Sequence, residues 1–87
     1  MEPSVEVSLL VGPDQKAYGI VVKVTATDFP GILASITSGF DKLNLSVRSA
    51  RVTTTYKVIA NRFVLNYDEN ANLDAIKEAT LAAVNSA

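Results

Sequence analysis

The sequence predicts an α+β fold in which two helices lie on one face of a four-stranded antiparallel sheet. Three observations lead to this prediction. Two early segments alternate apolar and polar residues, two later segments do the same, and a segment with helical spacing of apolar residues follows each pair. With 87 residues, of which 48% are hydrophobic, the chain is expected to form one small domain over residues 1–87, with its core in residues 5–86.

The first two strands are expected to form a hairpin. Apolar residues alternate with polar ones from residue 5 to residue 11, and the alternation returns in residues 20–26. The residues between them, 12–17, include Gly12, Pro13 and Asp14, which favour a turn. Strands joined by so short a loop are expected to be antiparallel neighbours.

A first helix is predicted over residues 32–43, because apolar residues spaced by three or four positions form one stripe: Leu33, Ile36, Phe40 and Leu43. Asp28 is expected to cap this helix, and Pro30 to lie in its first turn, where a missing N–H costs nothing. Gly39 in mid-helix costs about 1 kcal/mol against alanine. Close packing on the sheet would explain this glycine, and so would contact with a second subunit.

The second half of the chain is expected to repeat strand, strand and helix. Asn44 ends the first helix in left-handed geometry, and the alternation in residues 45–55 changes phase, which a bulge near Arg48 and Ser49 would repair. Residues 54–57 form a turn, and the strand over residues 58–67 turns four side chains inward: Ile59, Phe63, Leu65 and Tyr67. Asn72 then caps a last helix, whose stripe is Leu73, Ile76, Thr80 and Val84.

This order of elements contains a ferredoxin-like unit that lacks only its last strand. The missing strand would lie antiparallel beside residues 19–26, and the N-terminal strand can take its place. The predicted fold is therefore a ferredoxin-like sheet in the permuted order ββαββα. Four basic side chains are expected on its open face as solvated charges: Lys23, Arg48, Arg51 and Arg62.

Composition excludes several classes of function. The net charge of −1 provides no electrostatic attraction to nucleic acid or anionic membranes, and no apolar run approaches the ~18 residues of a membrane-spanning helix. The chain has no cysteine and no histidine, which removes disulfides, thiolate nucleophiles, structural zinc and imidazole acid–base chemistry. An enzyme built on this chain would have to work with carboxylates, lysines and hydroxyls alone. We expect no metal, no cofactor and no enzymatic activity. The start of the sequence shows no secretory signal, so an intracellular location is expected.

The junction between the second strand and the first helix is the most informative segment. A carboxylate, a proline and a glycine at Asp28, Pro30 and Gly31 predict a rigid turn that directs backbone N–H groups and the positive end of the helix dipole to one spot. The carboxylate of an amino acid could bind there without any catalytic side chain. The junction therefore favours a binding module over an enzyme.

The segment Asp28-Phe29-Pro30-Gly31-Ile32-Leu33 resembles the D-x-P-G-x-L signature of ACT domains. Residues 43–47 look like the helix-to-strand segment that follows it there, and residues 50–54 and 63–65 are similar to later strands. The resemblance covers about residues 5–86. With its leading extra strand, the chain looks most like ACT domains of bacterial nitrogen-sensing uridylyltransferases and of plant and algal ACT-repeat proteins.

The resemblance implies a regulatory module that binds a small amino acid at a homodimer interface. The loop of one subunit would grip the ligand, and the start of the following strand of the other subunit would complete the site. The loop residues are Asp28, Phe29, Pro30, Gly31, Ile32 and Leu33, and the strand residues are Asn44, Ser46 and Val47. The N–H groups of Gly31, Ile32 and Leu33 would bind the ligand carboxylate, Asp28 its ammonium, and Ser46 would offer a hydroxyl.

Some family members have asparagine at the position of Asp28 and histidine two residues earlier, and some serine binders have asparagine at that of Ser46. These departures leave the ligand open. The expected partners are a small amino acid, a second copy and a catalytic domain attached outside this chain, but neither nucleic acid nor membrane. The expected compartment is the cytoplasm, or a plastid for a plant or algal chain. Regulation in nitrogen or amino-acid metabolism is the expected setting.

Three alternatives share this fold. A dimerisation module without a ligand would also explain the high apolar content of so small a chain. A nucleic-acid binder of the RRM type would stack bases on aromatics of the open face, but the predicted open-face positions hold none: Val21, Lys23, Thr25, Ala60, Arg62 and Val64. An acylphosphatase-like enzyme would need an arginine in the loop before the first helix, which this chain lacks.

Overall fold

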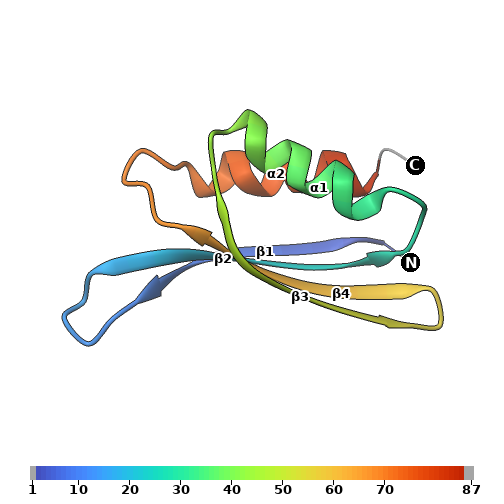
Figure 1. Ribbon diagram of the computed structural model, residues 1–87, viewed down its shortest axis with the longest axis horizontal. Helices are drawn as coiled ribbons and strands as arrows, with labels where there is room; N and C mark the ends of the chain where they lie inside the picture. The colour runs from blue at the N-terminus through green and yellow to red at the C-terminus, as the bar shows by residue number, and fades with distance from the viewer. Residues whose placement is uncertain (1, 86–87) are drawn as a thin grey trace.

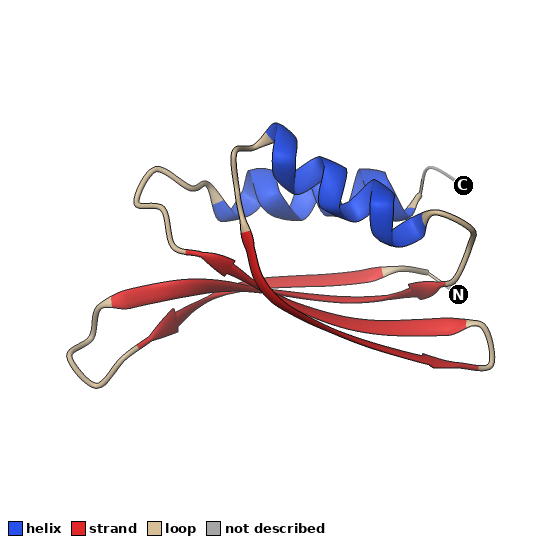
Figure 2. Cartoon of the chain, in the orientation of Figure 1, coloured by secondary structure: helices blue, strands red, loops and turns tan. Residues whose placement is uncertain are grey.

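The computed structural model describes residues 2–85, so residues 1, 86 and 87 of the predicted domain, and residue 86 of its predicted core, lie outside the described part. The strands are β1 (Ser4–Val11), β2 (Ala17–Thr27), β3 (Val47–Thr55) and β4 (Val58–Asn66), and the helices are α1 (Ile32–Lys42) and α2 (Leu73–Val84) (Figure 1). The strands form one antiparallel sheet in the order β1-β2-β4-β3. Both helices lie on the same face of it (Figure 2), so the predicted ferredoxin-like fold is confirmed.

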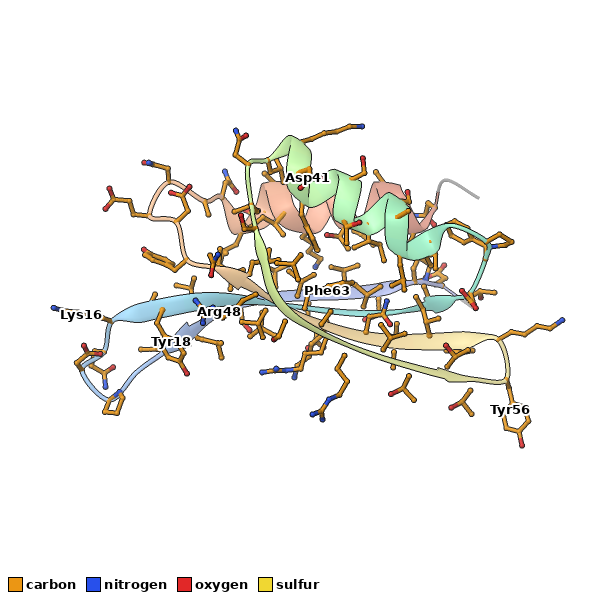
Figure 3. The ribbon with its side chains drawn as sticks, viewed as in Figure 1. Lys16, Tyr18, Asp41, Arg48, Tyr56 and Phe63 are labelled. Carbon is orange, nitrogen blue, oxygen red and sulfur yellow. The ribbon has the colours of Figure 1, made fainter. Side chains whose placement is uncertain are left out.

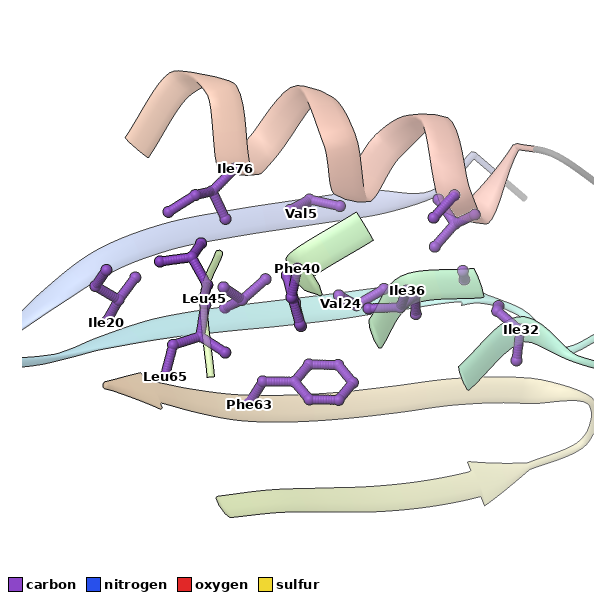
Figure 4. Packing of buried hydrophobic residues seen from close by; sticks show 14 of the residues in the cluster. Val5, Ile20, Val24, Ile32, Ile36, Phe40, Leu45, Phe63, Leu65 and Ile76 are labelled. Atoms are coloured by element: carbon purple, nitrogen blue, oxygen red, sulfur yellow. The ribbon is translucent and has the colours of Figure 1, made fainter. Parts of the chain in front are cut away.

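The core lies between the helices and the sheet (Figure 4). Alternate residues of β2 and β4 point to it, as predicted, and Phe40 of α1 packs edge-on against Phe63 of β4 with ring centroids 5.3 Å apart. The register of β3 on β4 shifts between Val47 and Ser49, which confirms the predicted bulge. The predicted hairpin of β1 and β2 is also confirmed, although Ala17 already belongs to β2.

Helix α1 begins at Ile32, as predicted, but its cap differs from the prediction. Its N-cap is Gly31 at φ 83°, with no side-chain cap, so the prediction that Asp28 caps the helix is wrong. Phe29 to Ile32 form a tight turn, in which the Ile32 N–H donates a hydrogen bond to the Phe29 carbonyl at 3.1 Å. The positive φ of Gly31, at the third position of the turn, identifies it as type II. Pro30 therefore precedes the helix and does not lie in its first turn.

The turn also sets which face of α1 is buried. The buried residues are Ile32, Ile36 and Phe40, whereas Leu33 is 40% exposed, so its predicted place on the inward stripe is wrong. Gly39 faces α2: a Cβ there would lie 3.7 Å from the Ala79 carbonyl oxygen. The proposed close packing of this glycine on the sheet is thus wrong, since its close neighbour is a helix.

The predicted end of α1 at Asn44 and the predicted start of α2 at Asn72 are confirmed. Asn44 has φ 58°, and the N–H groups of Asn44 and Leu45 bond to the carbonyls of Asp41 and Phe40, which is a Schellman ending. Asn72 caps α2 by accepting from the Ala75 N–H at 3.0 Å. Tyr67, predicted inward, follows the end of β4 and is 43% exposed, so that prediction is wrong.

The helices leave β3 bare. Each residue of β3 is exposed, including those whose side chains face the helix side of the sheet, such as Val52, which pairs with the inward Asn61. Arg48 is not a merely solvated charge: its guanidinium donates to the Tyr18 carbonyl at 2.6 Å and to the Asn66 Oδ1 at 3.1 Å. It therefore ties β3 across β4 to the start of β2.

Candidate functional site

A groove of about 480 Å³ runs between the loop before α1 and the bare inner face of β3. It contains the whole predicted loop together with residues of the β3–β4 hairpin, and its lining is Asp28, Phe29, Pro30, Gly31, Ile32, Leu33, Ala34, Val52, Thr54, Lys57 and Ile59. The six loop residues singled out in the sequence thus lie together. One bond fixes the loop against the hairpin, because the Asp28 N–H donates to the Lys57 carbonyl at 2.7 Å.

The β3–β4 turn that holds this loop is itself unusual. Its two central residues, Tyr56 and Lys57, have φ of 49° and 65°, which is the left-handed geometry of a type I′ hairpin turn. Asparagine and glycine usually occupy such positions, because other side chains adopt them at a cost in energy. The site therefore rests on a tight turn that the sequence does not favour locally.

The N–H groups at the start of α1 are the donors of the groove. The Ile32 N–H is already bonded to the Phe29 carbonyl, whereas the N–H groups of Leu33 and Ala34 have no backbone acceptor within residues 2–85. They lie at the positive end of the helix dipole. An anion at this end would therefore meet the N–H groups of Leu33 and Ala34, and the Ile32 N–H would only brace the turn.

The walls of the groove are mixed in character. Phe29, Ile32, Val52 and Ile59 supply apolar surface, and Thr54 supplies a hydroxyl. Asp28 and Lys57 add a negative and a positive group, both exposed to solvent. Apolar walls with a few convergent polar groups are the usual design of small-molecule sites. A small zwitterion matches this set of groups.

The strand half of the predicted site lies elsewhere. Asn44 and Ser46 line a separate hollow of about 450 Å³ with residues that follow β4, and Val47 begins β3 beside them. Figure 1 shows this region and the loop at opposite ends of α1. The helix has 11 residues and is therefore about 16 Å long. The two predicted halves of the site do not meet within one chain.

Sequence reasoning missed five lining residues: Ala34, Val52, Thr54, Lys57 and Ile59. Ala34 could have been predicted from the sequence. Proline and glycine at the centre of a tight turn indicate that the N–H of the next residue closes the turn, so the unbonded N–H groups belong to the residues after it. The four hairpin residues could not have been predicted, since their exposure depends on where the helices lie across the sheet. Within residues 2–85 no cluster of potential metal ligands occurs, and no helix there is long and apolar enough to cross a membrane.

A family model described as plant bHLH transcription factor, ACT-like domain, matches residues 15–85. The chain belongs to this ACT-like domain family. The resemblance read from the sequence is thereby confirmed, and ACT-like domains are typically regulatory. The match is to a domain family of this kind and not to a catalytic domain.

Among curated proteins, this ACT-like domain is similar to the bifunctional uridylyltransferase/uridylyl-removing enzymes of two strains of Aliivibrio fischeri, MJ11 and ATCC 700601 / ES114. Each is 29% identical over 69 residues, which is 79% of this chain. The chain spans only 8% of the length of these relatives. Among solved structures, an unknown protein from Galdieria sulphuraria superposes with a TM-score of 0.70 and 19% identity, over 78% of this chain and 39% of that chain. That likeness supports the fold alone.

Proposed function

We propose that this ACT-like domain binds a small amino acid between two copies of itself and so regulates an attached or partner protein, without catalysing a reaction. The observation that carries the proposal is the groove beside the loop of residues 28–34. Its far wall is a strand that no helix covers, so the groove is open on the side where a second copy can approach.

The free edge of β3 suggests how the second copy would sit. β3 is the last strand of the described sheet, so the backbone groups along its outer edge are available for pairing. Antiparallel pairing of two β3 strands would bring the first residues of one strand beside the last residues of the other. Ser46 and Val47 of the second copy would then approach Thr54, which lines the groove of the first. This arrangement would unite the two halves that one chain keeps apart.

Each polar group then has a role. The N–H groups of Leu33 and Ala34 would bind the carboxylate of the ligand. Asp28 would bind its ammonium, and the ligand side chain would lie against Val52 and Ile59. Because residues of both copies would contact the ligand, binding would favour one mutual arrangement of them, and an attached domain could sense that arrangement.

The test is a thermal-shift screen against the twenty amino acids, with light scattering after gel filtration on the same samples. A ligand at about 100 times its Kd stabilises by about 2.7 kcal/mol, which raises the Tm of so small a domain by several degrees. Gly31→Val should abolish the shift, because valine disfavours φ 83° and the turn would open.

A matched pair of variants separates loss of binding from loss of fold. Thr54 lines the groove, whereas its neighbour Thr55 lies on the opposite face of β3, and both are exposed. Thr54→Lys should remove the ligand shift, and Thr55→Lys should retain it. Equal behaviour of the two variants, or no shift with any amino acid, would reject binding in this groove.

One observation favours a second function, that of a dimerisation module without a ligand. Leu33, Val47 and Val52 are large apolar residues that stay 40–44% exposed near the bare strand. A dimer that forms at micromolar concentration, gains no stability from any amino acid and dissociates in Val52→Lys would establish this function instead.

A further inference from the structure

The open face of the sheet carries a row of like charges. The strand registers place Lys23 of β2 directly opposite Arg62 of β4, and Arg62 directly opposite Arg51 of β3. Glu6 of β1 pairs with Lys23 and supplies the opposite charge at one end. All four side chains are exposed. Lys23 and Arg62 alternate along their strands with the buried Val24 and Asn61, so the row lies on the face away from the helices, a face that Figure 2 shows without a helix. We call Lys23, Arg62 and Arg51 the basic row.

This row is unfavourable in the isolated domain. Adjacent strands are about 4.8 Å apart, and like charges directly opposite each other destabilise a sheet. The rows on either side of it are neutral: Thr25, Ala60 and Thr53 on one side, and Val21, Val64 and Ser49 on the other. A carboxylate placed over Arg62 would offset the repulsion with both of its neighbours at once.

The face also has a shape that suits such a group. A hollow of about 280 Å³ is lined by Ser49, Ala50 and the two arginines of the basic row, Arg51 and Arg62. Arginine binds carboxylates through two parallel hydrogen bonds, and it is weakly hydrated compared with lysine, which favours its use at interfaces. The hydroxyl of Ser49 adds a further donor in the same hollow.

The charges of the described residues are distributed unevenly between the two layers. Exposed carboxylates gather on the helices and on the loops that lead into them, namely Asp28, Asp41, Asp68, Glu69, Asp74 and Glu78; Figure 3 labels Asp41 on this side. Although the net charge is only −1, the open face of the sheet is therefore basic and the helix layer is acidic. A long polyanion would meet both layers, whereas a short acidic segment would meet only the row.

We infer that the basic row is a docking surface for an acidic protein segment, one that presents glutamate or aspartate side chains in an extended conformation. A single-stranded nucleic acid fits less well, because neither the basic row nor the rows on either side of it carry an aromatic side chain on which bases could stack. The groove proposed for the amino acid lies on the helix side of the sheet, so the two sites are separate and can be tested separately.

The experiment measures the fluorescence anisotropy of three labelled probes with the whole chain: a short peptide of alternating glutamate and serine, the same peptide with glutamine for glutamate, and oligothymidine. At about 50 mM salt, where screening is weak, the glutamate peptide should bind at least about tenfold more tightly than the glutamine peptide. Arg51→Gln with Arg62→Gln should remove about tenfold of that affinity. The matched pair on the helices, Lys42→Gln with Lys77→Gln, removes the same charge and should change it less than about twofold.

Two further measurements distinguish a loss of peptide binding from unfolding of the variant. The variant with both arginines replaced by glutamine should melt no lower than the original chain, because it loses like-charge repulsion. Arg51→Glu with Arg62→Glu should gain affinity for a peptide of alternating lysine and serine, which an unfolded chain would not do. Equal losses in the sheet and helix variants would overturn the proposal, and so would tighter binding of oligothymidine than of the glutamate peptide.

Discussion

The two edge strands of the sheet differ in how they are protected. β1 is packed under α2, and its Val5 is 5% exposed, whereas each residue of β3 is exposed on both faces. Both strands carry valines on the helix side, so the exposure of Val52 follows from where the helices lie. An edge that is covered contributes to stability, and an edge left bare is available for binding.

The exposure of one row of paired residues changes across the sheet, from the covered edge to the bare edge. On the helix side, Val5, Val24, Asn61 and Val52 pair in succession from β1 to β3. Their exposed fractions are 5%, 1%, 3% and 44%. The cover therefore ends between Asn61 and Val52, which is where the groove begins.

The largest expected effect compares two valines of this row, Val24 at its covered centre and Val52 at its bare end. Val24→Ala should lower the free energy of unfolding by about 2–3 kcal/mol, because it removes two buried methyl groups and leaves a cavity. The identical change at Val52 should cost no more than about 0.5 kcal/mol in the monomer. Urea unfolding at low protein concentration measures both. Similar losses at the two sites would mean that β3 is covered after all.

Asn61 gives the next largest effect. It is 3% exposed, and neither its amide nitrogen nor its amide oxygen has a partner among the described residues. A buried polar group without a hydrogen bond destabilises a protein, so Asn61→Leu, which keeps the shape, should raise the free energy of unfolding by about 1–2 kcal/mol. Asn61→Asp should lower it, since a charge would be buried. If Asn61→Leu instead destabilises the chain, the amide has a partner that the single chain does not provide.

The sequence predicted what depends on neighbouring residues. The order of elements, the bulge near Arg48 and Ser49, the left-handed Asn44 and the Asn72 cap all follow from local patterns, and the structure confirms them. The cap at Asp28 was a local error, because the type II turn at Pro30 and Gly31 separates Asp28 from the first helical residue and makes Gly31 the N-cap. The hairpin side of the groove could not be predicted from the sequence. Val52 and Thr54 line the groove only because neither helix covers β3.

A smaller effect is expected at the turn that joins the bare strand to the core. Lys57 has φ 65° in the β3–β4 turn, a backbone conformation that glycine adopts without strain. Lys57→Gly should therefore raise the free energy of unfolding by about 1 kcal/mol. Gln15, at φ 66° in the β1–β2 loop, is the matched control at the covered edge, and Gln15→Gly should produce a similar gain. A loss of stability in Lys57→Gly alone would indicate that its side chain supports the groove beyond the bond that its carbonyl makes.

The smallest effect is expected in the two helices that cover the sheet. Gly39 faces α2, the helix that packs on β1, and an added Cβ would lie 3.7 Å from the Ala79 carbonyl oxygen, which is an ordinary contact. Gly39→Ala should therefore gain about 0.5–1 kcal/mol from helix propensity without displacing α2. Ser38→Gly at the exposed neighbour should lose about 0.5 kcal/mol, which fixes the scale for this helix. A monomer that gains stability while its dimer weakens would place a second copy on the helices and not on the bare strand.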